Sequence, residues 1–310
     1  MKGIFVGMLL LTQITFAQHP ISLVRTSFRS ERIVVPGYHT SIQIPLELVN
    51  GIPLVEAKLN QTLGKYILDT GAPMLLINQI PMQNSDIQAQ GINGTFRGGA
   101  VKVTDFEWHT QRQKQMVAVA ADLTHMERAI KRPIAGIIGY DLLKNSELLL
   151  DYAGGQLALL DPRKNELHRT ASPLLVVPFT MQEHLPVIEI QVEGRTLRLV
   201  LDTGAGINLL DEACAQPFSA TTLYRLGQEQ LQGISPTIEQ GTSVRIAGAM
   251  IGRQSLPEMK FLLSDLTQFN TKIGIPVDGL LGYSFFKQMK CSIHYSEQKF
   301  YIWSWQNTIQ

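Results

Sequence analysis

The sequence predicts an all-β fold made of two copies of one unit, on three observations. Short segments such as 54–60 (LVEAKLN) and 187–194 (VIEIQVEG) alternate apolar and polar residues, which is typical of half-buried strands. Two continuous apolar runs, YILD and LVLD, are typical of interior strands. Residues 44–78 also align with residues 177–211 without a gap, which indicates an internal repeat.

The bulk composition narrows the class of protein. The chain has 310 residues, of which 45% are apolar and 17% are charged, and its formal net charge is +1. These values are ordinary for a globular protein with a sizeable core. Because the charges are scattered, nothing favours nucleic acid or an anionic membrane as a partner.

The N-terminus has the layout of a secretory signal peptide. One lysine precedes an apolar stretch that is too short to span a bilayer comfortably, and a small residue follows at Ala17. We therefore expect residues 1–17 to be a signal peptide and the protein to be exported, either periplasmic or secreted. An uncleaved N-terminal anchor is the alternative. Residues 18–43 form an N-terminal extension, and the sequence leaves open whether it is a propeptide.

The repeat continues beyond the first aligned block. An offset of 133 positions superposes Asp69 on Asp202, together with the Thr-Gly-Ala that follows each of them. Farther along, AGIIGYDLLKN resembles DGLLGYSFFKQ, and the two closing segments pair Tyr152 with Tyr295. Each copy therefore contains paired strands, Asp-Thr-Gly, a variable middle, two apolar residues with glycine, a short helix and a closing hairpin.

This pattern sets the domain organisation. We expect a first lobe at 44–160, a polar linker at 161–173 and a second lobe at 174–310. Within the first closing hairpin, the Gly-Gly pair at 154–155 stands where the chain should turn.

The cysteine and histidine content argues against a metal. The two cysteines, Cys214 and Cys291, could form a disulfide in an exported chain, and two buried thiols are the alternative. Neither a CxxC pair nor an HExxH motif occurs in the sequence. The sequence therefore predicts no metal site and no cofactor.

Asp69 and Asp202 carry the chemistry that the duplication permits. Glycine two residues after each aspartate allows a tight turn and the close approach of another chain segment. If the copies pack about a pseudo-twofold axis, the two carboxyl groups meet at that axis. Two carboxyl groups so close share a proton, so one can act as general base toward a water and the other as general acid toward a carbonyl.

These residues resemble the signature of the retropepsin-like and pepsin-like aspartic proteases. The chain reads ILDTGA with IIG in the first copy and LVLDTGA with LLG in the second, and the resemblance extends from about residue 44 to residue 305. It implies a bilobal aspartic-protease (acid protease) fold, made of two retropepsin-like β-barrel repeats with short helices around one cleft.

The resemblance also implies roles for individual residues. Asp69 and Asp202 would be the catalytic pair. The threonines would link the two active-site loops by hydrogen bonds across the axis, and the glycines would let those loops approach each other. The loop-support residues are Thr70, Gly71, Ala72, Thr203, Gly204 and Ala205. The apolar residues expected to pack beneath the loops are Ile137, Ile138, Leu280 and Leu281.

Ala72 and Ala205 bear on the pH of activity. Pepsin-like enzymes usually have Ser or Thr at these positions, and its hydroxyl can bond a catalytic carboxylate. Hydrogen bonds to the charged form lower the pKa of a carboxyl group. The pair in this chain should therefore be less acidic, as in the retroviral enzymes that share Ala, and we expect activity at mildly acidic to near-neutral pH.

Members of these families cover the cleft with β-hairpin flaps. The candidate flaps are residues 91–103, which are Gly-rich and contain Phe96, and residues 231–246 in the second copy. Phe96 is accordingly a candidate substrate-binding residue. Plain surface hairpins are the alternative.

The sequence therefore predicts an exported aspartic endopeptidase. We expect a monomer that binds a polypeptide substrate as an extended strand between its lobes. We expect no nucleic-acid partner and no membrane span after signal removal. A non-catalytic peptide-binding protein on the same fold is the main alternative, and a pairing of aspartates between two chains is another. The sequence does not separate a narrow processing protease from a general one.

Overall fold

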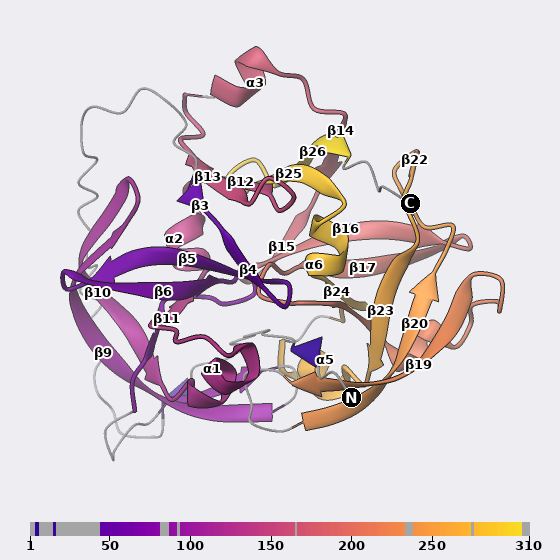
Figure 1. Ribbon diagram of the computed structural model, residues 1–310. Helices are drawn as coiled ribbons and strands as arrows, with labels where there is room; N and C mark the ends of the chain where they lie inside the picture. Colours follow the sequence, from indigo (N-terminus) through magenta and orange to yellow (C-terminus); the bar gives the residue numbers. More distant parts are fainter. Residues whose placement is uncertain are drawn as a thin grey trace.

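Two β-sheet lobes stand side by side and a third sheet joins them (Figure 1). The computed structural model describes residues 4–5, 15–16, 44–80, 87–91, 94–164, 166–232, 238–273 and 276–305. Most of the expected signal peptide and all of the 18–43 extension lie outside these residues. The described pieces before residue 44 are two short strands, β1 (Ile4–Phe5) and β2 (Thr15–Phe16), and they pair with β19 and β8, respectively.

The first lobe is a nine-stranded sheet that closes into a barrel. The strand order is β2-β8-β9-β10-β7-β11-β6-β5-β4, and an additional pairing of β9 with β5 completes the ring. The strands after β2 are β4 (Glu47–Val49), β5 (Ile52–Leu59), β6 (Thr62–Leu68), β7 (Leu76–Asn78), β8 (Ile87–Gly91), β9 (Gly94–Trp108), β10 (Gln111–Ala121) and β11 (Gly136–Ile138).

The second lobe repeats this order. Strands β19-β20-β23-β18-β24-β17-β16 follow one another as β8-β9-β10-β7-β11-β6-β5 do in the first lobe, and β15 pairs with β16 as β4 pairs with β5. The strands are β15 (Thr180–Gln182), β16 (Leu185–Val192), β17 (Arg195–Leu201), β18 (Asn208–Asp211), β19 (Leu223–Gln232), β20 (Ile238–Ile246), β21 (Met250–Ile251), β22 (Gln254–Ser255), β23 (Met259–Ser264) and β24 (Gly279–Leu281).

The second lobe differs from the first in how its sheet ends. The sequence predicted a barrel in both copies, but within the described residues no pairing joins β20 to β16. Instead, the small β21–β22 hairpin occupies this edge of β16, where Met250 of β21 pairs with Gln191 of β16. A chain segment already bonded along that edge blocks the pairing that closes the first barrel.

The third sheet is built equally from both copies. Its order is β14-β26-β25-β12-β13-β3, so β12 of the first copy and β25 of the second lie antiparallel at its centre. The strands are β3 (Ile44–Pro45), β12 (Glu147–Asp151), β13 (Gln156–Leu160), β14 (Leu175–Pro178), β25 (Met289–His294) and β26 (Lys299–Trp305). The closing hairpin predicted for each copy is therefore present, with Gly155 at a φ of 62° in the first turn, and the two hairpins form one sheet.

The helices are short and only two of them were predicted. The expected helices after each apolar-apolar-Gly are α2 (Tyr140–Leu143) and α6 (Tyr283–Phe286). The others are α1 (Thr124–Ile130), α3 (Glu166–Thr170), α4 (Glu212–Ala215) and α5 (Thr267–Ile273). The helix α3 lies within the predicted linker at 161–173 and places a turn of helix over the shared sheet (Figure 1).

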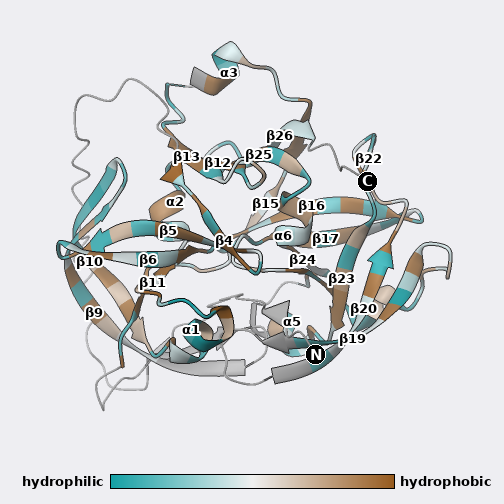
Figure 2. Ribbon diagram, in the orientation of Figure 1, coloured by the Kyte–Doolittle hydropathy of each residue, from teal (hydrophilic) through white to brown (hydrophobic). Residues whose placement is uncertain are grey.

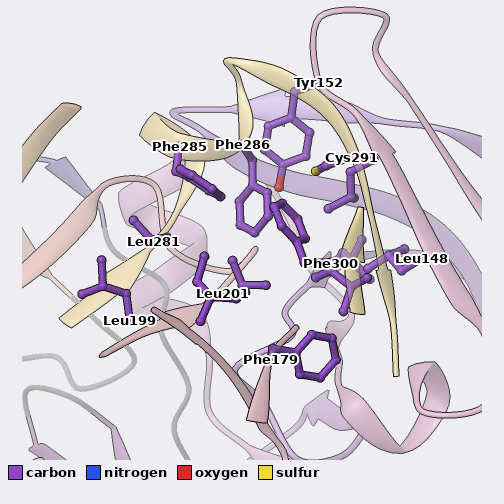
Figure 3. Close-up of a cluster of buried hydrophobic side chains, with 14 of the residues drawn as sticks. Leu148, Tyr152, Phe179, Leu199, Leu201, Leu281, Phe285, Phe286, Cys291 and Phe300 are labelled. Atoms are coloured by element: carbon purple, nitrogen blue, oxygen red, sulfur yellow. The ribbon is translucent and has the colours of Figure 1, made fainter. Parts of the chain in front are cut away.

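One hydrophobic core runs through all three sheets. Hydropathy alternates along strands such as β16, in line with their half-buried pattern (Figure 2). In Figure 3, Phe286 of α6 lies between Tyr152 and Phe300, with ring centroids 6.0 and 6.4 Å away, respectively. Each fully buried aromatic side chain of this kind stabilises the fold by about 1.5–3 kcal/mol. The lobes and the shared sheet therefore pack as one unit.

Two further sequence expectations can be compared with the structure. Cys214 and Cys291 are free thiols, so no disulfide joins them; Cys291 is buried as the alternative expected, whereas Cys214 is only partly buried. Among the described residues, no helix is long and apolar enough to cross a membrane.

Candidate active site

Asp69 and Asp202 occupy equivalent positions at the ends of two interior strands. Asp69 follows β6 and Asp202 follows β17, and both residues are fully buried. Parallel pairing with β11 and β24 fixes the ends of these strands. The Asp69 amide donates to the Ile138 carbonyl at 3.0 Å, and the Asp202 amide donates to the Leu281 carbonyl at 2.9 Å. These contacts fix the backbone position of each aspartate at the end of its strand.

The two aspartate loops are bound to each other by their threonines. The Thr70 hydroxyl donates to the Leu201 carbonyl at 2.8 Å and accepts from the Thr203 amide at 3.0 Å. The reciprocal bonds run from the Thr203 hydroxyl to the Leu68 carbonyl at 2.8 Å and from the Thr70 amide to Thr203 Oγ1 at 3.1 Å. The loops predicted to meet at a pseudo-twofold axis are therefore joined by matched hydrogen bonds.

The glycines bring backbone donors to the carboxyl groups. Gly71 N–H donates to Asp69 Oδ1 and Gly204 N–H donates to Asp202 Oδ1, both at 2.8 Å. A Cβ on Gly71 would lie 3.0 Å from Asp202 Cγ, so only glycine fits between the two loops. The structure thus brings together Asp69, Gly71 and Asp202, as predicted from the repeat.

The two carboxyl groups do not ionise independently. Burial, the charge of Asp69 and a hydrogen bond with Asp69 raise the pKa of Asp202 well above its usual value, against the lowering effect of the Gly204 and Ala205 backbone donors. Among the described residues, Asp202 Oδ2 is buried and has no donor apart from a proton that the neighbouring Asp69 carboxyl could supply. A proton shared with Asp69 would satisfy this oxygen.

The apolar-apolar-Gly segments support the loops from below. All four apolar residues predicted for this role are buried, namely Ile137, Ile138, Leu280 and Leu281. The glycine that follows each pair has no room for a side chain. A Cβ on Gly139 would approach the Ala72 carbonyl to 2.6 Å, and one on Gly282 would approach the Ala205 carbonyl to 2.3 Å. Ala72 and Ala205 themselves are fully buried.

The candidate flaps are hairpins. Strands β8 and β9 pair from Ile87–Gly98 to Gly91–Gly94, and β19 and β20 form the corresponding hairpin in the second lobe. The Phe96 backbone lies in the first hairpin opposite Ala89, while its side chain lies outside the described part of the structure. The predicted contact of Phe96 with substrate therefore stays a prediction.

A hollow of about 540 Å³ opens beside the first aspartate loop. Met74, which belongs to this loop, lines it together with Met116 and Leu142, and Lys102 and Lys144 add positive charge. Lys144 also forms an ion pair with Asp141 at 2.6 Å. Neither Asp69 nor Asp202 lines this hollow, so it is separate from the aspartate pair.

Two residues of the site were missed in the sequence. Asn208 is fully buried, and its side chain accepts from the Gly282 amide at 2.8 Å and donates to the Lys260 carbonyl at 3.1 Å. His184 is buried too, and its Nε2 lies 2.9 Å from the Gly71 carbonyl. The ungapped repeat sets Asn208 against Leu75 and His184 against Gly51, so neither residue recurs and the sequence alone does not mark its role.

The chemistry open to this arrangement is that of a proton-sharing carboxyl pair. One carboxylate can take a proton from a water while the other carboxyl donates one to a carbonyl oxygen. Among the described side chains, no group of three His, Cys, Asp or Glu is arranged to hold a metal ion.

Comparison with known families agrees with this chemistry. Residues 188–288 match the protein-family model described as gag-polyprotein putative aspartyl protease. The matched range contains Asp202 with its Thr-Gly-Ala and extends through Gly282 to α6. A search of the curated proteins finds no match to the chain.

Proposed function

We propose that the protein is an exported aspartic endopeptidase, and the match of residues 188–288 to a family model of aspartyl proteases supports this proposal. The observation that carries the proposal is the set of matched threonine hydrogen bonds, because they hold two buried aspartates together at the junction of the lobes. Aspartates that served only as turn residues would not need to be held next to each other in this way. The signal-like residues 1–17 support the proposal of export.

Peptide hydrolysis follows from one shared proton. The ionised carboxylate removes a proton from a water, whose oxygen attacks the carbonyl carbon of the scissile amide. The protonated carboxyl gives its proton to the carbonyl oxygen. The amide nitrogen then takes the proton that came from the water, while a hydroxyl of the tetrahedral species returns its proton to the other carboxylate. The C–N bond breaks to give an amine and a carboxylic acid, and the pair again holds one proton. No covalent enzyme intermediate is needed.

A polypeptide is the substrate class that fits the surroundings. The β8–β9 and β19–β20 hairpins supply extended strands, the kind of element with which a peptide pairs in strand-addition complexes. The signals for substrate sequence lie in the divergent middle parts of the two copies.

Activity should lie at mildly acidic to near-neutral pH. Burial, the charge of Asp69 and a hydrogen bond with Asp69 raise the pKa of Asp202, and the backbone donors of Gly204 and Ala205 lower it by less. A Ser or Thr hydroxyl that would lower it further is absent at Ala205. The carboxyl that must carry the proton therefore keeps it to a higher pH than an exposed aspartate would.

The test is cleavage of casein by the mature chain across pH 3–8, with and without a statine-type inhibitor. We expect cleavage that the inhibitor blocks. Asp69→Asn and Asp202→Asn should each lower kcat/KM by about 10²–10⁴-fold, because each removes a group that transfers a proton. The control is Asp265→Asn, an exposed residue whose bond to the Thr267 amide an asparagine can also make.

A folded chain that cleaves neither casein nor a broad peptide library would overturn the proposal. Binding of library peptides without cleavage would then identify a peptide-binding protein on the same fold. Equal activity in Asp69→Asn and Asp265→Asn would show that the pair does not perform the reaction.

A further inference from the structure

His184 connects the second lobe to the aspartate loop of the first. It lies in the turn between β15 and β16, is 6% exposed and reaches the Gly71 carbonyl through Nε2 at 2.9 Å. A carbonyl oxygen only accepts, so Nε2 carries the proton of this hydrogen bond. The imidazole therefore contacts the loop of Asp69 from across the lobe junction.

Gly71 is the residue that touches both candidate catalytic carboxyl groups. Its amide donates to Asp69 Oδ1 at 2.8 Å, and its Cα faces Asp202, whose Cγ would lie 3.0 Å from a Cβ. Because this position must be glycine, the backbone here has no side chain to restrain it. The hydrogen bond from His184 supplies a restraint on the Gly71 carbonyl.

This restraint exists on one side of the pseudo-twofold axis only. The repeat sets Gly51 opposite His184, and Gly51 has a φ of 83° with the Tyr283 ring 2.8 Å from the place of a Cβ. A histidine cannot be accommodated there. Among the described side chains, none donates to the Gly204 carbonyl, which is the counterpart of the Gly71 carbonyl.

His184 donates this bond as a neutral group over most of the acidic range. Burial lowers the pKa of His184 to about 4, and the hydrogen bond to Gly71 and the charge of Asp141 offset only part of this effect. Asp141 belongs to α2, whose Tyr140 ring lies 6.5 Å from the imidazole, and Lys144 of the same segment pairs with Asp141. Thus no positive charge on His184 acts on the aspartates above about pH 5.

We propose that His184 is a positioning residue that fixes Gly71, so that Asp69 is the ionised member of the pair and Asp202 the protonated one. This inference rests on the proposed function and assigns the two roles in it: Asp69 is the general base toward water and Asp202 the general acid toward the carbonyl. The physical cause is that a fixed Gly71 amide stabilises the charged form of Asp69.

The substitutions His184→Leu and His184→Gln separate this role from a merely structural one. Leucine removes the donor, whereas the side-chain amide of glutamine places an N–H at about the reach of Nε2 and does not titrate. In His184→Leu, we expect the acid limb of the kcat/KM profile to move to higher pH by about one unit. At pH values below this limb, kcat/KM should fall about tenfold, with KM little changed. His184→Gln should retain the wild-type profile. The matched control is His109→Asn in the β9–β10 turn, where asparagine tolerates the φ of 56°.

A second readout does not depend on turnover. ¹³C NMR of the aspartate carboxyl groups should show the lower apparent pKa of the pair raised in His184→Leu and unchanged in His184→Gln. If the wild type cleaves nothing, the proposed function fails, while this titration still tests His184. Unchanged titrations in both variants, or equal shifts in both, would overturn the inference.

The wild-type protein gives an independent check if His184→Leu does not fold. ¹⁵N NMR of the histidines should show His184 with its proton on Nε2 from about pH 5 to pH 7. A proton on Nδ1 would exclude the bond to Gly71 and with it the proposed role.

Discussion

At the scale of single residues, Thr70 and Thr203 do more than cap a turn. Each hydroxyl donates to a carbonyl of the opposite lobe and accepts from an opposite amide. Both residues are fully buried, so water cannot replace a lost partner. The position of each aspartate therefore depends on a threonine from the other copy.

Thr70→Val should destabilise the protein and impair the site together. Loss of the hydroxyl leaves the Leu201 carbonyl and the Thr203 amide buried without their partner, at about 1–3 kcal/mol for each group. We expect the free energy of unfolding in urea to fall by about 2–4 kcal/mol. Thr70→Ser, which keeps the hydroxyl, is the control and should lose less than half of that. Equal losses would mean that the methyl group, and not the hydrogen bonds, matters.

The sequence predicts the residues of the site that occur twice and misses those that occur once. Asp, Thr, Gly and Ala recur at one offset, so the repeat itself marks them. His184 and Asn208 stand opposite Gly51 and Leu75, and a single polar residue in a strand-rich segment gives no sign of its partner. Their hydrogen bonds join segments 113 and 74 residues apart along the chain, which only the folded backbone reveals.

At the scale of elements, the sequence pattern predicts strands and turns, whereas the short helices depend on tertiary contacts. Alternation and glycine positions predict β5, β6, β16, β17 and the β12–β13 turn. The helix α3 has five residues, too few to show a helical period or to be stable alone. Nor does the sequence reveal that the two closing hairpins form one sheet, because β12 pairs with a strand more than a hundred residues away.

A buried acid holds α3 against the shared sheet. The Glu147 carboxyl is 2% exposed at the centre of this sheet, and His168 Nε2 of α3 lies 3.0 Å from Oε2. Ser292 of β25 donates to Glu147 at 2.5 Å, and the His168 ring contacts Tyr301 and Trp303 with centroids 4.5 and 4.9 Å away. The linker between the copies is thus fastened to both of them.

His168→Leu should release the linker. Glu147 would keep Ser292 but lose its histidine partner inside the sheet, and a buried polar group left without a partner costs about 1–3 kcal/mol. We expect faster cleavage within residues 161–173 in limited proteolysis, together with a lower free energy of unfolding. Arg169→Leu, in the same helix but exposed, is the control. Identical cleavage rates in both variants would show that the His168–Glu147 contact does not hold the linker.

At the scale of the whole molecule, His184 and Asp202 make the free energy of unfolding depend on pH in opposite directions. The pKa of His184 is about 4 in the folded chain against 6.5 unfolded, so only the unfolded chain takes up its proton between these values. Stability from this group is complete above pH 6.5 and falls by about 3 kcal/mol on acidification to pH 4. Asp202 has a raised pKa, so its contribution is complete below pH 3.8 and falls as the pH rises toward its folded pKa.

The pH dependence of urea unfolding between pH 4 and 7 measures these contributions. His184→Gln removes the group that loses stability on acidification, so its free energy of unfolding should change less with pH than that of the wild type. Asp202→Asn removes the opposing group, so its stability should fall more steeply on acidification. A His184→Gln curve parallel to that of the wild type would show that His184 is not a buried neutral group.

The repeat places Gly51 at the position equivalent to His184, and this difference between the copies has a consequence for the proposed substrate. A peptide has a direction from its N-terminus to its C-terminus, and a cleft with perfect twofold symmetry presents the same surroundings to either orientation. In this chain the imidazole stands on one side of the aspartate pair and the Tyr283 ring beside Gly51 stands on the other. The two copies are therefore no longer equivalent around the aspartate pair, and under the proposed function this difference would favour one orientation of a bound peptide.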